Sequence, residues 1–393
     1  MRFDQYFYNY ANPLGKNGTR VTESKKHLSV AKKLAVEGTV LLKNNGVLPL
    51  KKGEKVCVFG RGAGEWIFGG GGSSAVRATK KVSLTDALEQ ADAQGQIRLF
   101  SPLITDAKRQ INAIFEERAA NPIGSQHAWN RHRSLNTLPL DETLYHQAVA
   151  FGGTALFTLL RYSSEGTVDG DRSLKKGDFS LYDEEKDLLF RLQKDFKKVV
   201  VILCVCGPVE TKIYRDSDKI GAVLYSLYGG ALAGEALVDI LTGKRYPSGH
   251  LQDTLAEKIT DYPSTKSFYE FEDHVDYTED IFVGYRYFET FCPEKVVFPF
   301  GYGLGYADFT LEYRKAVYKN DRVSITISVA NTGNFPGKEV VQIYQTRPKA
   351  SWEKQSRSFA PLPKPGSYCP VKARSFVFPL TCGILLLLMI WAR

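Results

Sequence analysis

The sequence predicts an α/β protein with a mostly parallel sheet, followed by a truncated all-β domain. Between residues 27 and 256, apolar runs alternate with amphipathic stretches, which is typical of a parallel sheet covered by helices. From about residue 309 the pattern changes to a period of two, as in half-buried antiparallel strands. Only about three such strands fit before the pattern ends near residue 346, whereas a complete sandwich needs about seven.

The elements of the first domain can be placed from short segments of sequence. Four apolar runs are expected strands: residues 55–60, 152–161, 198–207 and 220–228. Four stretches with helical spacing are expected helices: residues 28–40, 83–91, 180–196 and 231–243. Ser83 or Thr85 is a suitable N-cap for the second helix, and Gly243 ends the last. Function in such a sheet is expected in the loops 60–74, 162–172 and 207–211, which follow strands.

Composition excludes several classes of function. The chain has 393 residues and a net charge of +9, but residues 346–393 hold eight Lys/Arg and one Glu, so most of the excess lies there. The rest has no basic patch interleaved with aromatics, so no nucleic-acid partner is expected. The six cysteines suggest neither a zinc site nor a disulfide framework, and no cofactor or metal is expected.

No membrane or secretory segment is expected either. The N-terminus lacks the apolar core of a signal peptide. The apolar stretch CGILLLLMIWAR near the end is shorter than the about 20 residues that span a bilayer. A cytoplasmic location is therefore the expectation.

The segment VCVFGRGAGEWIFGGGGSS, residues 56–74, suggests a phosphate-binding loop at first sight. The dinucleotide fingerprint G-x-G-x-x-G fits at Gly60 and Gly62, but its third glycine falls on Glu65, whose carboxylate would repel a pyrophosphate. The G-K-[ST] triplet of a P-loop is also missing. A strand followed by a loop that is glycine-rich for another reason is favoured.

Seven stretches resemble glycoside hydrolase family 3, the β-glucosidase and β-xylosidase type. They are AVEGTVLLKNNGVLPL, GGGGSSAV, SSEGTVDGDRSL, VVVILCVCGPVE, VDYTEDIFVGYRYF, FPFGYGLGYADF and VANTGNFPGKEVVQIY, in the family's order over roughly residues 27–345. The resemblance implies an α/β sandwich followed by a fibronectin-III-like domain. It also implies that the catalytic nucleophile, an Asp, belongs to a separate (β/α)8 barrel, and that the sandwich supplies the acid/base Glu.

The resemblance divides the chain into five parts. These are a polar leader (1–26), the α/β sandwich (27–256), a connector (257–304), a partial fibronectin-III-like domain (305–345) and a tail (346–393). Because the sandwich comes first, the chain resembles the subgroup in which the barrel is the last domain. No stretch resembles the barrel or its nucleophile, so this chain alone is expected to be inactive.

The tail is expected to be frameshifted sequence. From Thr346 onward the codons can be read in a frame shifted by one base, so that the third base of each codon becomes the first base of the next codon. With permitted codons chosen accordingly, the shifted frame encodes a peptide that resembles the missing continuation of the fibronectin-III-like domain. A one-base shift near Gln345, natural or introduced in sequencing, would explain both the basic charge and the apolar end of the tail.

Glu165 in RYSSEGTVDGDR is the candidate general acid/base. It follows a buried strand on a polar loop, and it matches the family's acid/base position. A loop glutamate is more commonly only solvated, and the family's E-G-x-D-R is lengthened here to E-G-T-V-D-G-D-R. Asp169 is a further polar candidate, while Asp171 and Arg172 are expected to support the loop by an ion pair.

The glycine-rich loop is expected to lie beside the sugar. By the resemblance, Gly71, Gly72 and Ser73 let the backbone approach a sugar or the barrel. Trp66 and Phe68 are candidates for stacking on a leaving-group sugar, and anchoring of the loop in the core is an equally good alternative.

The expected function is retaining hydrolysis of terminal β-glycosidic bonds in a β-linked glucoside or short oligosaccharide, with a separate (β/α)8 barrel as partner. The alternative is a non-catalytic carbohydrate-binding or interaction module, a truncated pseudoenzyme. A Ser/His/Asp hydrolase is excluded because the chain has no G-x-S-x-G segment.

Overall fold

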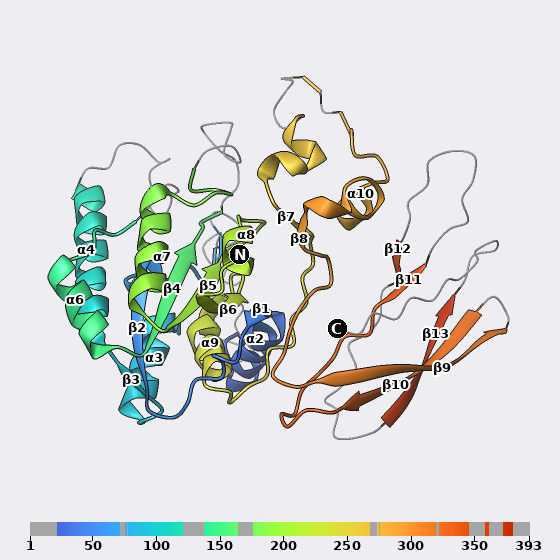
Figure 1. Ribbon diagram of the computed structural model, residues 1–393, viewed down its shortest axis with the longest axis horizontal. Helices are drawn as coiled ribbons and strands as arrows, with labels where there is room; N and C mark the ends of the chain where they lie inside the picture. The colour runs from blue at the N-terminus through green and yellow to red at the C-terminus, as the bar shows by residue number, and fades with distance from the viewer. Residues whose placement is uncertain are drawn as a thin grey trace, which may run out of the picture.

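The structure is a computed structural model, shown as a ribbon in Figure 1. It describes residues 22–70, 75–76, 78–120, 137–163, 176–267, 273–274, 276–319, 322–345, 358–360 and 372–379. An α/β domain lies on the left of Figure 1, a small β-sheet domain on the right, and a connector with short helices above and between them.

A six-stranded sheet forms the centre of the α/β domain, with strand order β1-β6-β5-β4-β2-β3. Its strands are β1 (Val40–Asn44), β2 (Glu54–Gly60), β3 (Ile97–Leu99), β4 (Thr154–Leu160), β5 (Lys198–Cys204) and β6 (Ile220–Tyr225). Pairing is parallel throughout except that β1 runs antiparallel to β6 at one edge. The predicted α/β fold with a mostly parallel sheet is confirmed.

Helices cover both faces of this sheet. They are α2 (Lys25–Gly38), α3 (Leu84–Ala93), α4 (Ser101–Ala120), α6 (Glu142–Phe151), α7 (Asp183–Asp195), α8 (Lys212–Arg215) and α9 (Ala233–Leu241). Alternate residues of β2 enter opposite cores: Val56 and Val58 pack in the core with α2, α3 and α9, whereas Cys57 and Phe59 pack in the core with α6 and α7. Ser83 caps α3 and exchanges hydrogen bonds with Asp86, as a reciprocal capping box.

The helix expected over 28–40 ends earlier than its apolar spacing suggests. Helix α2 stops at Gly38, and residues 40–44 form β1, which the sequence had placed in the end of the helix and the following turn. Val40, Leu41 and Leu42 are all buried, so the run has no polar face by which its period could be recognised.

The connector follows β7 (Leu255–Ala256), the last strand of the α/β domain, which pairs with β8 (Val296–Phe298). Between them lie short helical turns (Ile259–Asp261, Pro263–Thr265 and Pro293–Lys295) and α10 (Tyr285–Phe291). The glycine-spaced segment 299–306 then runs back along the α/β domain, where a Cβ at Gly305 would overlap the phenol group of Tyr246. That contact explains why a residue without a side chain occurs there.

The small β-sheet domain has its own core. β9 (Phe309–Lys319), β10 (Arg322–Asn331) and β13 (Lys372–Pro379) form one sheet, and β11 (Ile343–Gln345) pairs with β12 (Ser358–Ala360). Alternate residues of β10, from Val323 to Val329, pack on Val341 and Ile343. Strands β12 and β13 belong to the tail 346–393, which therefore contributes backbone pairing to this domain.

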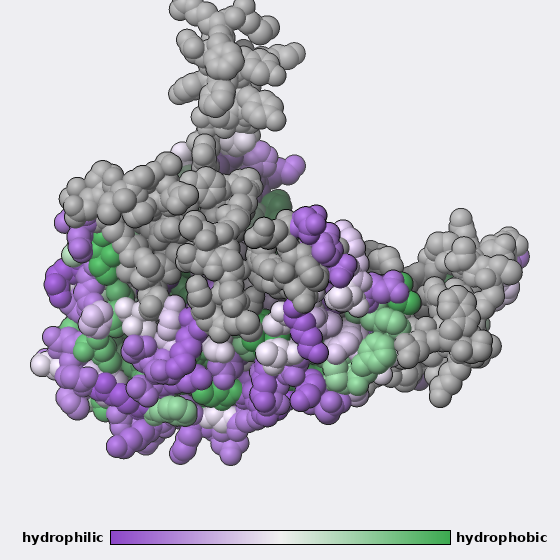
Figure 2. Space-filling view, turned by 90° about the horizontal axis from the view of Figure 1, so that it is seen from above, coloured by the Kyte–Doolittle hydropathy of each residue, from purple (hydrophilic) through white to green (hydrophobic). Residues whose placement is uncertain are grey.

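Seen from above, polar residues dominate the described surface of the α/β domain, with hydrophobic residues scattered among them (Figure 2). Within the described ranges, no helix combines the length and the apolar character that a membrane crossing requires.

Candidate functional site at the carboxyl ends of the strands

Strand order places a topological switch between β2 and β4. From β2 the chain passes to β3 on one side and then returns to β4 on the other, and β2 and β4 are parallel neighbours. In open α/β sheets, ligands bind outside the carboxyl ends of strands at such a switch, because the loops there diverge and leave a crevice. The loops 60–74 and 162–172, both of which the sequence analysis selected, follow β2 and β4 at this edge.

Thr158 joins the carboxyl ends of β2 and β4. Its hydroxyl donates to the carbonyl of Phe59 at 2.7 Å and accepts from the amide of Gly62 at 2.9 Å. A Cβ at Gly62 would lie 2.7 Å from the Cβ of Thr158, so only glycine fits without movement of the strand. Close packing on β4 thus explains this glycine without a phosphate.

Glu65 forms a buried ion pair at the same edge. Its Oε2 lies 2.8 Å from Nη2 and 2.9 Å from Nε of Arg61, and both side chains are almost fully buried. Tyr162, which begins the loop after β4, has its pKa raised by burial and further by the Glu65 charge. The carboxylate that breaks the phosphate fingerprint is therefore a structural partner of Arg61 and lies close to the second loop.

The two aromatic candidates differ in their surroundings. Trp66 is 6% exposed and belongs to the hydrophobic core, as the anchoring alternative expected. Phe68 is partly exposed and packs on the same core, and the Lys81 ammonium lies 5.6 Å from its ring centroid. Of the two, Phe68 is the ring that a ligand could reach.

The remaining predicted site residues lie outside the described residues. These are Glu165, Asp169, Asp171, Arg172, Gly71, Gly72 and Ser73. The structure does describe both ends of the loop that carries Glu165, up to Ser163 and again from Lys176.

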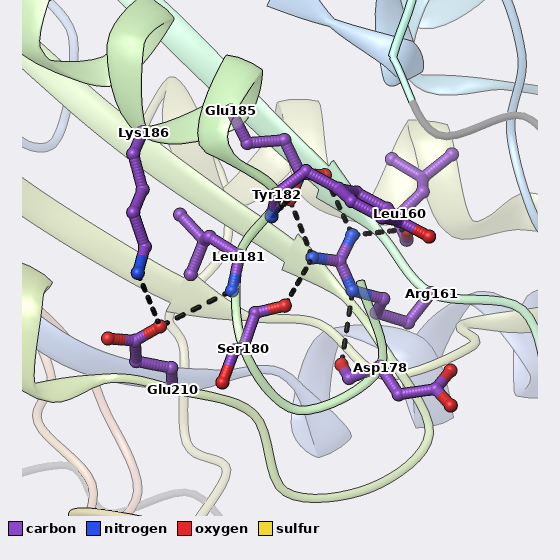
Figure 3. Close-up of polar contacts among 9 residues, drawn as sticks. All are labelled: Leu160, Arg161, Asp178, Ser180, Leu181, Tyr182, Glu185, Lys186 and Glu210. Carbon is purple, nitrogen blue, oxygen red and sulfur yellow. Dashed lines mark hydrogen bonds and ion pairs between the residues drawn. The ribbon is translucent and has the colours of Figure 1, made fainter. Parts of the chain in front are cut away.

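Arg161 holds these two loop ends together (Figure 3). It is the first residue after β4, and its guanidinium reaches the chain where it returns from the loop. Nε donates to the carbonyl of Asp178 at 3.1 Å, and Nη2 donates more weakly to that of Ser180 at 3.4 Å. One side chain thereby fixes the separation between the start and the end of the loop.

Glu185 on α7 completes this arrangement. Its two carboxylate oxygens accept from Nη1 and Nη2 of Arg161 at 2.8 and 2.7 Å, a bidentate pair (Figure 3). Oε2 also accepts from the backbone amide of Tyr182 at 2.9 Å. Burial by itself would lower the pKa of Arg161, but the hydrogen bonds and charge of Glu185 outweigh burial and raise it. The guanidinium of Arg161 therefore remains charged.

Two further side chains tie the loop ends to neighbouring strands. The Tyr228 hydroxyl, beyond β6, donates to the carbonyl of Arg161 and accepts from the amide of Ser163. Burial raises the pKa of Tyr228, so the phenol stays neutral. Glu210, beyond β5, accepts from the amide of Leu181 and forms an ion pair at 3.5 Å with the ammonium of Lys186 (Figure 3).

Sequence reasoning missed Arg161, Glu185 and Tyr228. An arginine directly after the apolar run 154–160 was a signal that a charge is held at the strand end. Its partner could not be inferred, because Glu185 lies 24 residues away and contacts Arg161 only through the placement of α7 beside β4. Among the described residues, no group of three His, Cys, Asp or Glu could hold a metal ion.

Comparison with known proteins agrees with this fold. Residues 39–306 match the model of the glycosyl hydrolase family 3 C-terminal domain. The chain is 36% identical over 387 residues to beta-glucosidase A of Butyrivibrio fibrisolvens, covering 88% of this chain and 44% of that protein. It is also 36% identical over 360 residues to a beta-glucosidase of Ruminococcus albus, covering 91% of this chain and 36% of the relative.

Solved structures give the same result. A beta-glucosidase from Paenibacillus barengoltzii superposes with a TM-score of 0.75 at 32% identity, over 89% of this chain and 38% of that one. Beta-glucosidase 3B from Thermotoga neapolitana, in complex with glucose, superposes with a TM-score of 0.79 at 29% identity, over 95% of this chain and 50% of that one. The chain belongs to glycosyl hydrolase family 3, and it spans less than half the length of the two curated relatives.

Proposed function

We propose that this chain is the acid/base-bearing part of a retaining β-glucosidase-type hydrolase that cleaves terminal β-glycosidic bonds. One observation carries the proposal: Arg161 clamps the two ends of the Glu165 loop at the β2–β4 switch, beside the glycine-rich loop. A loop that carries a general acid must return to one position in every cycle, and a buried bidentate pair at its base provides that constraint.

Glu165 would first donate a proton to the leaving-group oxygen and then accept one from the attacking water. Retaining hydrolysis also needs a nucleophilic carboxylate about 5–5.5 Å from the acid. We assign that carboxylate to a (β/α)8 barrel domain outside this chain, as the family resemblance implies. Phe68 would stack on the sugar, Gly71, Gly72 and Ser73 would line its approach, and Asp171–Arg172 would brace the loop.

The substrate class follows from the relatives. Two of them are named beta-glucosidases, and a structural relative is described in complex with glucose. A β-linked glucoside or short oligosaccharide is therefore the proposed substrate. The frameshift near Gln345 also remains a proposal, and resequencing of the locus tests it: an intact reading frame would refute it.

Hydrolysis of an aryl β-glucoside tests the proposed role of Glu165. The chain is assayed alone and mixed with a separately produced (β/α)8 domain of a relative, beside Glu165→Gln and the exposed control Glu184→Gln. We expect turnover only in the mixture, lower by at least about a hundredfold in Glu165→Gln and unchanged in Glu184→Gln. Equal rates for Glu165→Gln and the unaltered chain would refute the assignment.

Turnover by the chain alone that disappears in Glu165→Gln would instead place a nucleophile within these 393 residues. The alternative function, a carbohydrate-binding module without catalysis, predicts saturable glucoside binding without turnover in any mixture.

A further inference from the structure

A cavity away from the β2–β4 edge lies between the connector and the β-sheet domain. It has a volume of about 200 Å³, and its walls come from α10, the segment 299–304, the start of β9 and residues 339–344. Figure 1 shows α10, β9 and β11, which contribute residues to its walls. None of the described site residues named above, such as Arg61, Glu65, Phe68, Arg161 and Glu185, is among the residues that line it.

Aromatic rings form one side of the cavity. Tyr285 stacks on Phe300 with centroids 4.8 Å apart and planes at 24°, and Tyr344 meets Tyr285 edge to face at 6.1 Å. Each ring is supported by another, so the wall is rigid. Rigid flat aromatic surfaces of this kind suit a ligand that has a C–H face.

Planar polar groups also line the cavity, and hydrogen bonds within the protein hold them in place. Gln342 donates from Nε2 to the carbonyl of Gly301 at 2.7 Å and accepts at Oε1 from the Tyr344 hydroxyl at 2.6 Å. Glu339 accepts at Oε1 from the amide of Val340 at 2.7 Å, and the same oxygen lies 3.2 Å from Nε2 of His250. Each carboxylate or carboxamide group has more hydrogen-bonding positions than these contacts use.

The charges of the lining narrow the class of ligand. Among the described residues that line the cavity there is no lysine or arginine, whereas Glu289 and Glu339 are present, so a phosphate or carboxylate would be repelled. A wholly apolar ligand would remove the polar groups from water without replacing their hydrogen bonds, which is costly. A neutral ring with a C–H face and a rim of hydroxyls can stack on the aromatic side chains and also form hydrogen bonds with the polar groups.

We propose that this cavity is a second carbohydrate site, which binds one pyranose unit apart from the catalytic edge. The choice of a sugar rests on the proposed function, because a β-glucosidase-type enzyme encounters glucosides and glucose at high concentration. Because the cavity lies between the connector and the β-sheet domain, a bound sugar would contact both the segment 299–304 and the segment 339–344.

Titration of the full chain with methyl β-D-glucoside, followed by calorimetry, tests the proposal. Val340→Trp fills the cavity without removing a polar group, and Val30→Trp, at a position 49% exposed on α2, is its matched control. We expect the affinity to fall by at least about tenfold in Val340→Trp and to stay unchanged in Val30→Trp.

Hydrogen–deuterium exchange of the unaltered chain supplies a test that needs no variant. Added glucoside should slow amide exchange at 299–304 and 339–344. Two outcomes would place the sugar at the catalytic edge: protection confined to the ends of the 60–74 and 162–177 loops, or binding that is lost in Glu165→Gln but kept in Val340→Trp. Either outcome would overturn the proposed second site while supporting the proposed function. Absence of binding, or preference for a choline-like cation, would also overturn it.

Discussion

At the scale of single residues, the guanidinium of Arg161 organises the edge where the loops meet. It bonds to Glu185 on α7 and to the backbone at Asp178, so one side chain couples a strand, a helix and a returning loop. The side chains of Arg161 and Glu185 are each about a tenth exposed. Burial strengthens the attraction between the two charges and makes it costly in stability to leave either of them without its partner.

Arg161→Ala should therefore lower the free energy of unfolding by about 3–5 kcal/mol, because Glu185 would stay buried without its partner. The matched control is Arg191→Ala, which removes a bidentate pair with Glu142 on the surface. It should cost much less than Arg161→Ala, since solvent screens that pair. Urea denaturation measures both, and equal losses would show that the Arg161 pair is not effectively buried.

Gly62→Ala tests the packing of the β2–β4 junction. The added Cβ would lie 2.7 Å from Thr158 Cβ, so β4 or the loop must shift, at a cost of about 1–3 kcal/mol. Gly207, at the end of the neighbouring strand, has open space where a Cβ would be. Gly207→Ala should stay within about 0.5 kcal/mol of the unaltered chain in thermal denaturation. A neutral Gly62→Ala would contradict the close-packing explanation of the glycine-rich loop.

At the scale of elements, three strands are tied at their amino ends by Glu54. This residue begins β2, and its carboxylate accepts from Thr154 at the start of β4 and lies 2.5 Å from the ammonium of Lys198 at the start of β5. Burial alone would raise the pKa of Glu54, but the hydrogen bonds from Lys198 and Thr154 outweigh burial and lower it below its ordinary value of 4.5.

A lowered pKa in the folded state predicts acid sensitivity. The contribution of Glu54 is fully present above about pH 4.5, the ordinary value, and is lost as pH falls through the folded pKa. It is on the order of 1 kcal/mol, because Lys198 is more than a third exposed and solvent screens the pair. Denaturation from pH 6 to about pH 3 should show a shallower fall in stability for Glu54→Gln than for the exposed control Glu184→Gln. Parallel pH profiles would contradict this.

At the scale of the whole molecule, the cores are separate. The two faces of the six-stranded sheet carry the cores of the α/β domain, and the β-sheet domain has a small core of its own around Ile325 and Ile327. On β9, Tyr313 and Tyr318 stay 48% and 63% exposed, so this small sheet is incompletely covered. A domain that buries so little apolar surface should unfold at a lower free energy than the α/β domain.

Native-state hydrogen exchange should show this difference. Amides of β10 should exchange faster than those of β4 and β5, and their exchange should accelerate at denaturant concentrations that leave the α/β domain folded. A single transition with equal opening free energies for β10 and β4 would show that the two domains unfold as one unit.

Much of this architecture could be predicted from the sequence because its signals are local. Apolar runs of strand length became β2, β4, β5 and β6, and Ser83 became the cap of α3. The order of the motifs indicated the family, and the position of the loops after strands indicated which edge of the sheet carries the candidate site. Strand β1 was missed, because a run buried on both sides has no polar face to reveal its period.

The tertiary structure alone decided what holds the candidate site. The bonds of Arg161 to Glu185, of Thr158 to Gly62 and of Tyr228 to Ser163 join positions 24, 96 and 65 residues apart. Local pattern carries no record of such contacts, because they arise only when helices pack on a sheet and bring strand ends together. The sequence determined which residue types were present at the loops, and packing determined which of them meet.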